Sequence, residues 1–270
     1  MSSTRKSILR YHHGNTEATT DVIAVEEPLE IRIEGESVAV IMRSPNTDNL
    51  QEDIELVTGF LCTEGVIQDI TDIHAIQHIV DPCEPRYNTV DVVLSSGVPA
   101  KRKQSATEHV KRNLYASSSC GICGKATQDR IFQQFPPLLS KKEQVDLEKI
   151  CNLPTQLRMA QANFQQTGGT HAAMLFDGAY QPLYMREDIG RHNAVDKVIG
   201  ALLREDIPAG DCVLLVSGRV AFEIAQKALA VQIPIIVSIG APSSMAVDFC
   251  AKANIRLVGF VKEHRCNIYV

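Results

Sequence analysis

The 270-residue sequence lacks any long apolar run. No segment approaches the roughly 20 uninterrupted apolar residues that a membrane-spanning helix needs, so we expect no membrane partner. The start of the chain, "MSSTRKSILRYHHGNTEATT", is polar and has no apolar stretch typical of a signal peptide. We therefore expect a cytoplasmic protein, in which cysteine thiols stay reduced.

The sequence also lacks an excess of positive charge. Its net charge is −5 and its pI is about 5.9, which gives no general support for binding nucleic acid. The hydrophobic fraction of 44% and the charged fraction of 22% are ordinary for a soluble globular protein with a buried core. The length suits one large domain or two ordinary ones.

A second pair of closely spaced cysteines is missing as well. Only Cys120 and Cys123 have C-x-x-C spacing, within "SSSCGICGK". Structural zinc usually needs two such pairs, or one pair and two histidines. His171, His192 and Cys83 could contribute, but nothing in their spacing demands it, so we expect no zinc. Three other cysteines sit in apolar surroundings that favour small buried side chains, namely Cys62, Cys212 and Cys250.

Two chemistries stay open for the C-x-x-C pair. The polar, basic stretch "AKRKQSATEHVKRNLYASSS" precedes it, which favours a mobile loop. Lys125 and the upstream basic residues could lower a cysteine pKa and give a reactive thiolate. Such a thiolate suits thiol–disulfide exchange, and it also suits the carriage of sulfur as a persulfide. The residues alone do not separate the two.

The chain divides into four predicted segments. The first is a flexible tail, and the second is a small α+β domain that reads as hairpin, helix and hairpin. The third is the mobile loop, and the fourth is an α/β domain. The boundaries are 1–20, 21–104, 105–128 and 129–270.

The fourth segment carries the most regular pattern. "CVLLVS", "PIIVSI" and "IRLVGFV" read as strands, and the two stretches between them read as helices. This β-α-β-α-β order implies parallel strands with right-handed crossovers. Earlier in the segment, Asp177-Gly178 predicts a hairpin. A helix is expected over "LPTQLRMAQANFQQTGG", with Pro154 near its first turn.

The ends of the three parallel strands predict a ligand site. Ligands of open parallel sheets bind beyond the carboxyl ends of the strands. The first strand leads to Ser217-Gly218-Arg219, the second to residues 240–244 and the third to "FVKEHR". Small residues there let a ligand approach backbone N–H groups at helix starts, and Arg219, Lys262 and Arg265 add positive charge. We therefore expect an anionic ligand, although ordinary turns would have similar residues.

A second dense cluster is "REDIGRHNAVDKVIG". A helix beginning near Arg191 would place His192 and Asp196 on one face, since they lie four residues apart. His192 could then act as a general acid or base. The alternative interpretation is a solvated charged helix with surface ion pairs.

Several of these stretches together resemble the FdhD family, the formate dehydrogenase accessory sulfurtransferases. The resemblance covers nearly the whole chain beyond the first ~20 residues. The most specific match is "EDIGRHNAVDK" together with the C-x-x-C. The other matching stretches are "FLCTEGVI", "GGTHAAMLF", "SGRVAFEIAQKA", "GAPSSMAVDFCAKANIRLVGFV" and "NIYV".

The resemblance implies a function. Family members are cytoplasmic homodimers that carry sulfur between a cysteine desulfurase and formate dehydrogenase. They hold it as a persulfide and deliver it to a molybdenum (or tungsten) cofactor, bis-molybdopterin guanine dinucleotide, before the apoenzyme receives that cofactor. A guanine nucleotide is expected to mimic it. Three alternatives to this function stay open: a chaperone that binds the cofactor without transferring sulfur, a zinc-stabilised module, or a thiol–disulfide module.

The resemblance also implies a fold and site residues. The fold is α/β (α+β overall), with a small N-terminal α+β domain and a cytidine-deaminase-like three-layer domain. The zinc signature of those deaminases, H-x-E with P-C-x-x-C, is absent, so deaminase activity does not follow. Cys120 matches the persulfide-bearing residue and Cys123 its partner. The cofactor-binding residues are expected to be Phe260, Val261, Lys262, Glu263, His264 and Arg265, with Ser217, Arg219, Ser243, Arg191, His192 and Asn193.

Overall fold

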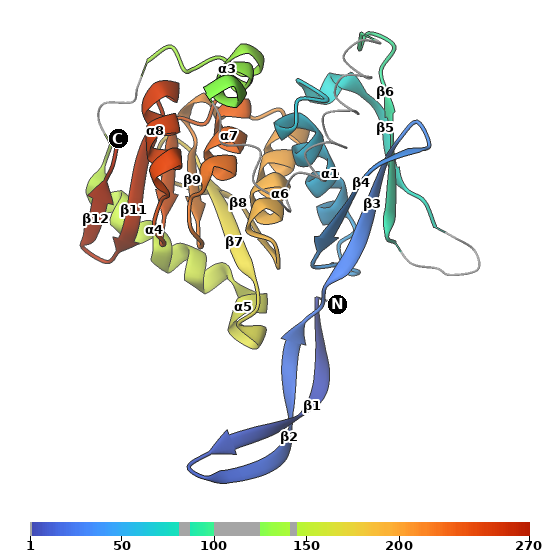
Figure 1. Ribbon diagram of the computed structural model, residues 1–270, viewed down its shortest axis with the longest axis vertical. Helices are drawn as coiled ribbons and strands as arrows, with labels where there is room; N and C mark the ends of the chain where they lie inside the picture. The colour runs from blue at the N-terminus through green and yellow to red at the C-terminus, as the bar shows by residue number, and fades with distance from the viewer. Residues whose placement is uncertain (1, 81–86, 100–124, 141–144) are drawn as a thin grey trace.

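The computed structural model describes residues 2–80, 87–99, 125–140 and 145–270 (Figure 1). Its largest element is a six-stranded sheet in the order β12-β11-β10-β9-β7-β8. β9, β10 and β11 are parallel, whereas β7, β8 and β12 each run antiparallel to a neighbour. The strands are β7 (His171–Phe176), β8 (Pro182–Asp188), β9 (Val213–Val216), β10 (Ile235–Ser238), β11 (Arg256–Lys262) and β12 (Arg265–Ile268).

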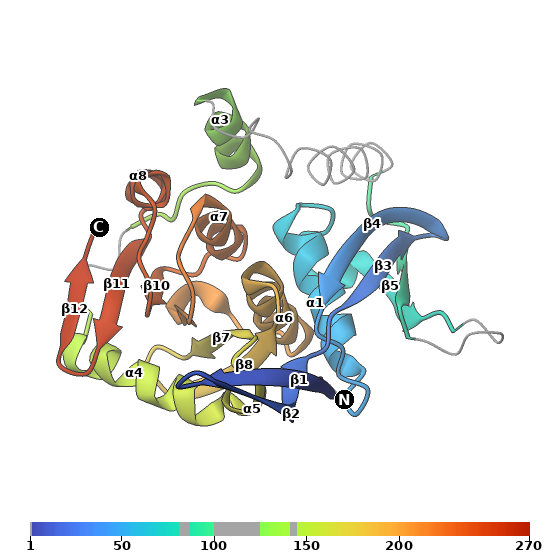
Figure 2. The ribbon, with the colours of Figure 1, turned by 60° about the horizontal axis from the view of Figure 1, so that its bottom comes forward.

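Helices cover both faces of this sheet (Figure 2). One face packs against α6 (Arg191–Arg204), α7 (Phe222–Ala230) and α8 (Ser244–Ala253). The other face packs against α4 (Leu147–Ala160). Alternate residues of β7 enter the two cores, because successive side chains of a strand point to opposite faces. The predicted three layers and the β-α-β-α-β order are confirmed, and the likeness to cytidine deaminases stays a prediction.

α4 begins six residues before the predicted helix start at Leu153. The Asp146 side chain accepts a hydrogen bond from the Lys149 N–H at 3.0 Å and so caps the helix. Pro154 therefore lies inside the helix rather than in its first turn. A short helix, α5 (Ala162–Thr167), follows and ends at Gly168, whose φ is 65°.

The N-terminal unit is a four-stranded sheet packed on one helix. Its strand order is β4-β3-β6-β5, and Glu34 and Gly35 make the predicted hairpin turn with φ of 52° and 83°. The elements are β3 (Glu27–Ile33), β4 (Glu36–Arg43), α1 (Gln51–Thr63), β5 (Ile73–His78) and β6 (Thr89–Leu94), with a 3-10 turn at Ile70–Asp72. A second 3-10 turn, Ala209–Asp211, lies between α6 and β9 in the other unit. This unit has its own hydrophobic core, as the hairpin–helix–hairpin pattern predicts.

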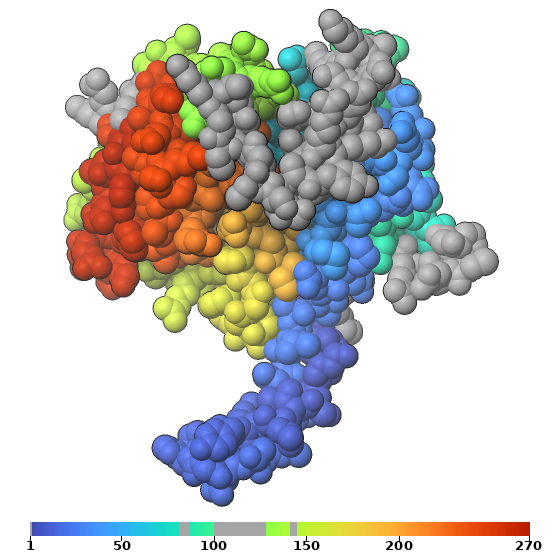
Figure 3. Space-filling model, viewed as in Figure 1, coloured from blue at the N-terminus to red at the C-terminus, as the bar shows by residue number. Residues whose placement is uncertain are grey.

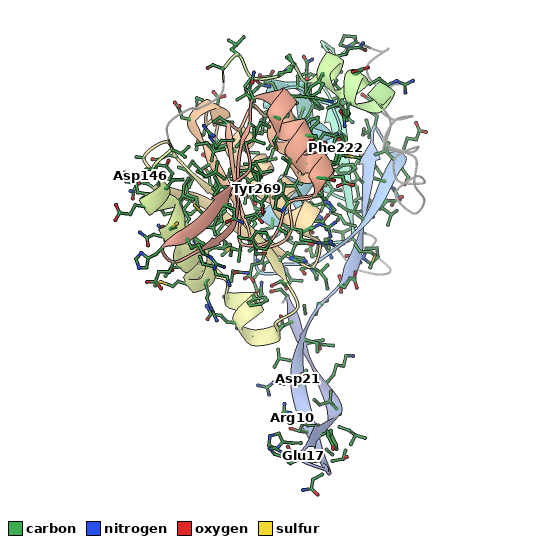
Figure 4. All side chains as sticks on the ribbon, turned by 60° about the vertical axis from the view of Figure 1, so that its left-hand side comes forward. Arg10, Glu17, Asp21, Asp146, Phe222 and Tyr269 are labelled. Atoms are coloured by element: carbon green, nitrogen blue, oxygen red, sulfur yellow. The ribbon has the colours of Figure 1, made fainter. Side chains whose placement is uncertain are left out.

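Residues 3–24 form a hairpin, whereas the sequence analysis predicted a flexible tail over residues 1–20. β1 (Ser3–His12) and β2 (Asn15–Ala24) pair along their whole lengths and project from the body as an arm (Figures 1 and 3). Figure 4 places Arg10 and Glu17 on this arm, far from Phe222 and Tyr269 in the body. The strands have few apolar residues, so their alternation is weak in the sequence. His13 and Gly14 supply the positive φ of the turn.

α3 (Lys125–Gln134) packs on the outside of the helix layer. The Phe132 ring stacks on the Phe249 ring of α8 with centroids 5.0 Å apart. Ile131 and Phe135 enter the core between the sheet and its helices. None of the helices in the described part of the chain is both long enough and apolar enough to cross a membrane.

α1 and α6 join the two units by a very close helix crossing. A β-carbon at Gly59 would overlap the Asp196 carbonyl oxygen, and one at Gly200 would overlap the Glu55 carbonyl oxygen. Only glycine lets two helix backbones approach this closely. The two units therefore pack as one body through these two positions.

We expect Gly200→Ala to destabilise the protein by on the order of 3 kcal/mol, because its methyl group meets rigid backbone. Urea unfolding measures the loss. Gly210→Ala is the matched control, since nothing lies within 4 Å of its added methyl group. Equal stability of the two variants would contradict the close crossing.

Candidate functional site

Three helices begin at the carboxyl edge of the large sheet. β8 leads into α6, β9 into α7 and β10 into α8, and these three strands share one direction. The positive ends of three helix dipoles therefore point toward this edge. The geometry agrees with the site predicted from the strand ends.

The loops at this edge are tied together by backbone contacts. Val220 pairs with Pro242 across the first two loops, and the Ser243 N–H donates to the Val220 carbonyl at 2.9 Å. The Phe260 N–H donates to the Gly240 carbonyl at 3.0 Å and joins the third strand end to the second loop. The structure thus brings the predicted strand-end residues to one edge.

The two predicted serines are already hydrogen-bonded within the protein. The Ser217 hydroxyl accepts from the Ala172 N–H at 2.9 Å, and the Ser243 hydroxyl accepts from the Ala246 N–H at 3.2 Å. The second contact caps α8. These side chains shape the loops, whereas Arg219 is exposed and leaves its charge available to a ligand.

The predicted stretch 260–265 runs from the end of β11 through a turn into β12. Phe260 is 40% exposed and has a φ of 51°, an uncommon conformation for a bulky residue. Lys262, Glu263, His264 and Arg265 are all exposed. The Val261 side chain instead packs into the core beneath α4, so only its backbone could meet a ligand.

The first turn of α6 lies beside the loop that follows β9. A β-carbon at Gly218 would lie 3.2 Å from His171 Nδ1 and 3.8 Å from Arg191 Cδ. His171 begins β7, which runs antiparallel to β9, and it therefore sits at the same edge. The sequence analysis considered His171 only as a possible zinc ligand, because the strand order that brings it to this edge cannot be read from its motif.

At the corner formed by His171, Gly218 and the first turn of α6, burial is the main cause of the pKa shifts, and neighbouring positive charge adds to it. Burial and the adjacent Arg191 lower the pKa of His192 to about 4, with smaller contributions from Lys227 and His171. Burial and Arg191 also lower the pKa of His171, and Asp188 opposes that shift. Both imidazoles are therefore held in the neutral form when no anion is present.

Two buried nitrogens at this corner lack a hydrogen-bond partner among the described residues. They are Arg191 Nε and His192 Nε2, each shielded from solvent. A buried polar nitrogen without a partner is costly. Both nitrogens are therefore candidate contacts for an anion at the sheet edge.

Asn193, also predicted as a site residue, ties α6 to the N-terminal unit. Its Nδ2 donates to the Met42 carbonyl at 2.7 Å and to Asp188 Oδ1 at 2.9 Å. Asp188 is fully buried and also accepts from the Ser44 N–H and from Lys197. Asn193 therefore positions the start of α6.

The interpretation of a solvated charged helix is wrong. Asp196 and Lys197 of α6 are 2% and 0% exposed. Asp196 contacts Lys227 Nζ at 2.8 Å and the Thr63 hydroxyl at 2.9 Å. Burial raises the pKa of Asp196 to about 6, although Lys227 pulls it downward. These charges lie inside the body, in the contact between α6, α1 and α7.

The C-x-x-C pair lies outside the described residues, as does Cys83. The predicted burial of Cys62, Cys212 and Cys250 is confirmed. Burial also raises the pKa of Cys62 to about 12, which leaves it unreactive as a thiol. Within the described ranges, no group of three or more His, Cys, Asp or Glu side chains could hold a metal ion.

We expect His192→Gln to flatten the pH dependence of stability between pH 6.5 and 4. An unfolded histidine titrates near pH 6.5, so in this window the unfolded chain binds the extra proton and the folded protein loses stability as pH falls. This difference between the folded and unfolded pKa of His192 corresponds to a loss of folding stability on the order of 3 kcal/mol across the window. Urea unfolding across this window measures it.

His74→Gln, at an exposed position, is the control and should keep the wild-type slope. The raised pKa of Asp196 acts in the opposite direction in the same window, so the difference between variant and wild type is the informative quantity. An unchanged slope in His192→Gln would argue against a neutral buried imidazole.

Comparison with known proteins agrees with this architecture. The chain is 40% identical over 268 residues to the sulfur carrier protein FdhD of Streptomyces coelicolor, covering 98% of this chain and 93% of that protein. It is 44% identical over 260 residues to the protein of the same name from Mycobacterium tuberculosis, covering 92% and 90%.

A solved structure shares the fold. The crystal structure of a protein from Desulfotalea psychrophila, described as a formate dehydrogenase accessory protein, matches with a TM-score of 0.73 at 20% identity. The match covers 99% of this chain and 96% of the other. The profile of the FdhD/NarQ family matches residues 24–270. The chain belongs to the FdhD/NarQ family.

Proposed function

We propose that this protein is a sulfur carrier that supports formate dehydrogenase. The observation that carries the proposal is identity near 40% over almost the whole chain to proteins named sulfur carrier protein. The sequence also has a C-x-x-C pair in a Ser- and Gly-rich stretch, which suits an accessible thiolate. The proposed setting is the cytoplasm, with a cysteine desulfurase as donor and a homodimer as the working form.

The first proposed step loads sulfur on Cys120. Its thiolate attacks the terminal sulfur of the donor persulfide, the donor S–S bond breaks, and the donor leaves as a thiolate. A persulfide forms on Cys120, and no external oxidant or reductant is consumed. A low thiol pKa favours this step because the thiolate is the nucleophile.

The second proposed step releases sulfur to the acceptor. The Cys123 thiolate attacks the Cys120 sulfur, a disulfide forms between the two, and the terminal sulfur leaves as hydrosulfide for the acceptor. The two cysteines supply the two electrons that reduce the terminal sulfur. A thiol reductant of the cell must then reopen the disulfide before another cycle.

The proposed acceptor is the bis-molybdopterin guanine dinucleotide cofactor, bound as a substrate at the carboxyl edge of the large sheet. Its phosphates suit the three helix starts and the exposed cations Arg219, Lys262 and Arg265. Phe260 offers a partly exposed ring on which a base could stack. Each residue here binds or orients the acceptor, and the cysteines handle the sulfur.

We expect Cys120 to gain the mass of one sulfur atom when the protein is incubated with a cysteine desulfurase and cysteine. Mass spectrometry of the C-x-x-C peptide measures the gain. The peptides that contain Cys62, Cys212 and Cys250 are internal controls, because these thiols are buried. An unmodified C-x-x-C peptide would exclude the carrier role.

A cofactor-binding chaperone is the competing function, and a variant with both Cys120→Ala and Cys123→Ala separates the two. The carrier mechanism predicts no active formate dehydrogenase in cells that have only this variant. Full activity would establish the chaperone instead. Metal analysis of the purified protein tests the zinc-stabilised module directly.

We expect a guanine nucleotide to bind the sheet edge and Arg219→Ala to weaken it about tenfold, by removing a charge-assisted contact. Calorimetry measures the affinity. Lys252→Ala is the control, because Lys252 lies in the last turn of α8, away from this edge. Equal affinity of Arg219→Ala and wild type would remove Arg219 from the site.

A further inference from the structure

The start of α6 has the wrong charge for a helix N-terminus. Acidic side chains are favoured there, because the first-turn N–H groups carry partial positive charge. In α6 the first turn has no acidic residue, Gly190 offers no side-chain cap, and the first two residues are Arg191 and His192. The charge of Arg191 at the positive end of this 14-residue helix is destabilising unless an anion faces it, and the neutral His192 does nothing to balance that charge.

Two buried nitrogens without a hydrogen bond to the described residues are independent evidence for an anion at the start of α6. Arg191 Nε and His192 Nε2 are both buried and lack a hydrogen bond to the described residues. Each belongs to a side chain that can donate to an oxyanion, provided that the imidazole proton is on Nε2. A ligand oxygen between them would satisfy both and balance the charge of the helix start.

The groups that surround this corner are mostly cationic or neutral. His171 enters from β7 and Lys227 acts on His192 from α7. Lys227 is already paired with Asp196, one turn further along α6. Asp188 is the carboxylate that acts on His171, and its oxygens are taken by Lys197, Asn193 and the N–H groups of Ser44 and Gly190.

The residues that follow β9 are small. Gly218, the second residue after β9, lies directly against His171 and Arg191, and a β-carbon there would lie 3.2 Å from His171 Nδ1. Ser217 and Gly218 are half-buried, and the exposed Arg219 follows. The corner is therefore continuous with the carboxyl edge described above.

We propose that His171, Arg191 and His192 form a subsite that binds one phosphate-type oxyanion of the ligand at the sheet edge. The proposal rests on the proposed function only for the identity of that ligand. It assigns the anion to the start of α6 and adds His171, a residue of β7, to the site. Arg219 then contacts a more exposed part of the same ligand.

Anion binding at this subsite is coupled to proton uptake by the two imidazoles. An anion beside the neutral imidazoles favours their charged form, so its binding draws a proton from solution. The protein therefore takes up protons on binding near neutral pH and binds more tightly at pH 6 than at pH 8. A site made only of arginine and lysine side chains would show neither effect.

Calorimetry of the full-length protein with inorganic sulfate tests the subsite, because sulfate neither binds nor releases a proton between pH 6 and pH 8. Titration in two buffers of different ionisation enthalpy gives the number of protons taken up. We expect Arg191→Gln and His192→Gln each to weaken binding about tenfold or more, and His192→Gln to reduce the proton uptake. Arg158→Gln and His74→Gln, both at exposed positions elsewhere, should match wild type.

Wild-type binding without proton uptake, or unchanged affinity in both variants, would overturn the subsite. The wild-type measurement stands even if a variant does not fold. The experiment can reject the subsite without rejecting the sulfur-carrier function, and the reverse also holds. Sulfate binding here without any persulfide on Cys120 would reject only the carrier, and a persulfide with unaltered binding in the variants would reject only the subsite.

Discussion

The close crossing of α1 and α6 is the constraint on which the rest of the structure depends. Gly59 and Gly200 let the two backbones touch, and buried ion pairs fill the space around them. Lys227 meets Asp196, and Arg186 of β8 meets Glu55 of α1 with both carboxylate oxygens. Because such charges are stable only when paired, the two units must dock in one register. That register sets where α6 begins, and with it the corner at the sheet edge.

Much of the fold could be predicted because local pattern decides it. The apolar strands β9, β10 and β11, the hairpin at Glu34-Gly35 and the start of α6 all follow from periodicity and turn residues. The interior of α6 could not, because Asp196 and Lys197 look like surface residues until their partners from α1, α7 and β8 are known. His171 was missed as a site residue for the same reason, since only the antiparallel pairing of β7 with β9 brings it to the edge.

The charge of the candidate site is local rather than global. The chain has a net charge of −5, yet the sheet edge gathers Arg191, Arg219 and the cations of the 260–265 stretch. A negative molecule with a positive edge attracts an anion to one place and repels it elsewhere, which favours a single binding orientation. The proposed carrier role would need the acceptor to meet a thiol in one defined pose, so orientation would matter as much as affinity.

The β1–β2 arm has a consequence for local stability. Among the described residues it is a sheet of two strands only, and Leu9 and Tyr11 near its tip are 74% and 72% exposed. Its anchor to the body is at its base, where Ser2 donates to Asn163 Oδ1 and β2 meets α5. An isolated ribbon of this kind is only marginally stable in water. The arm therefore opens at a free energy well below that of global unfolding. Its backbone amides exchange with solvent while the body, held together at the Gly59 and Gly200 crossing, stays folded.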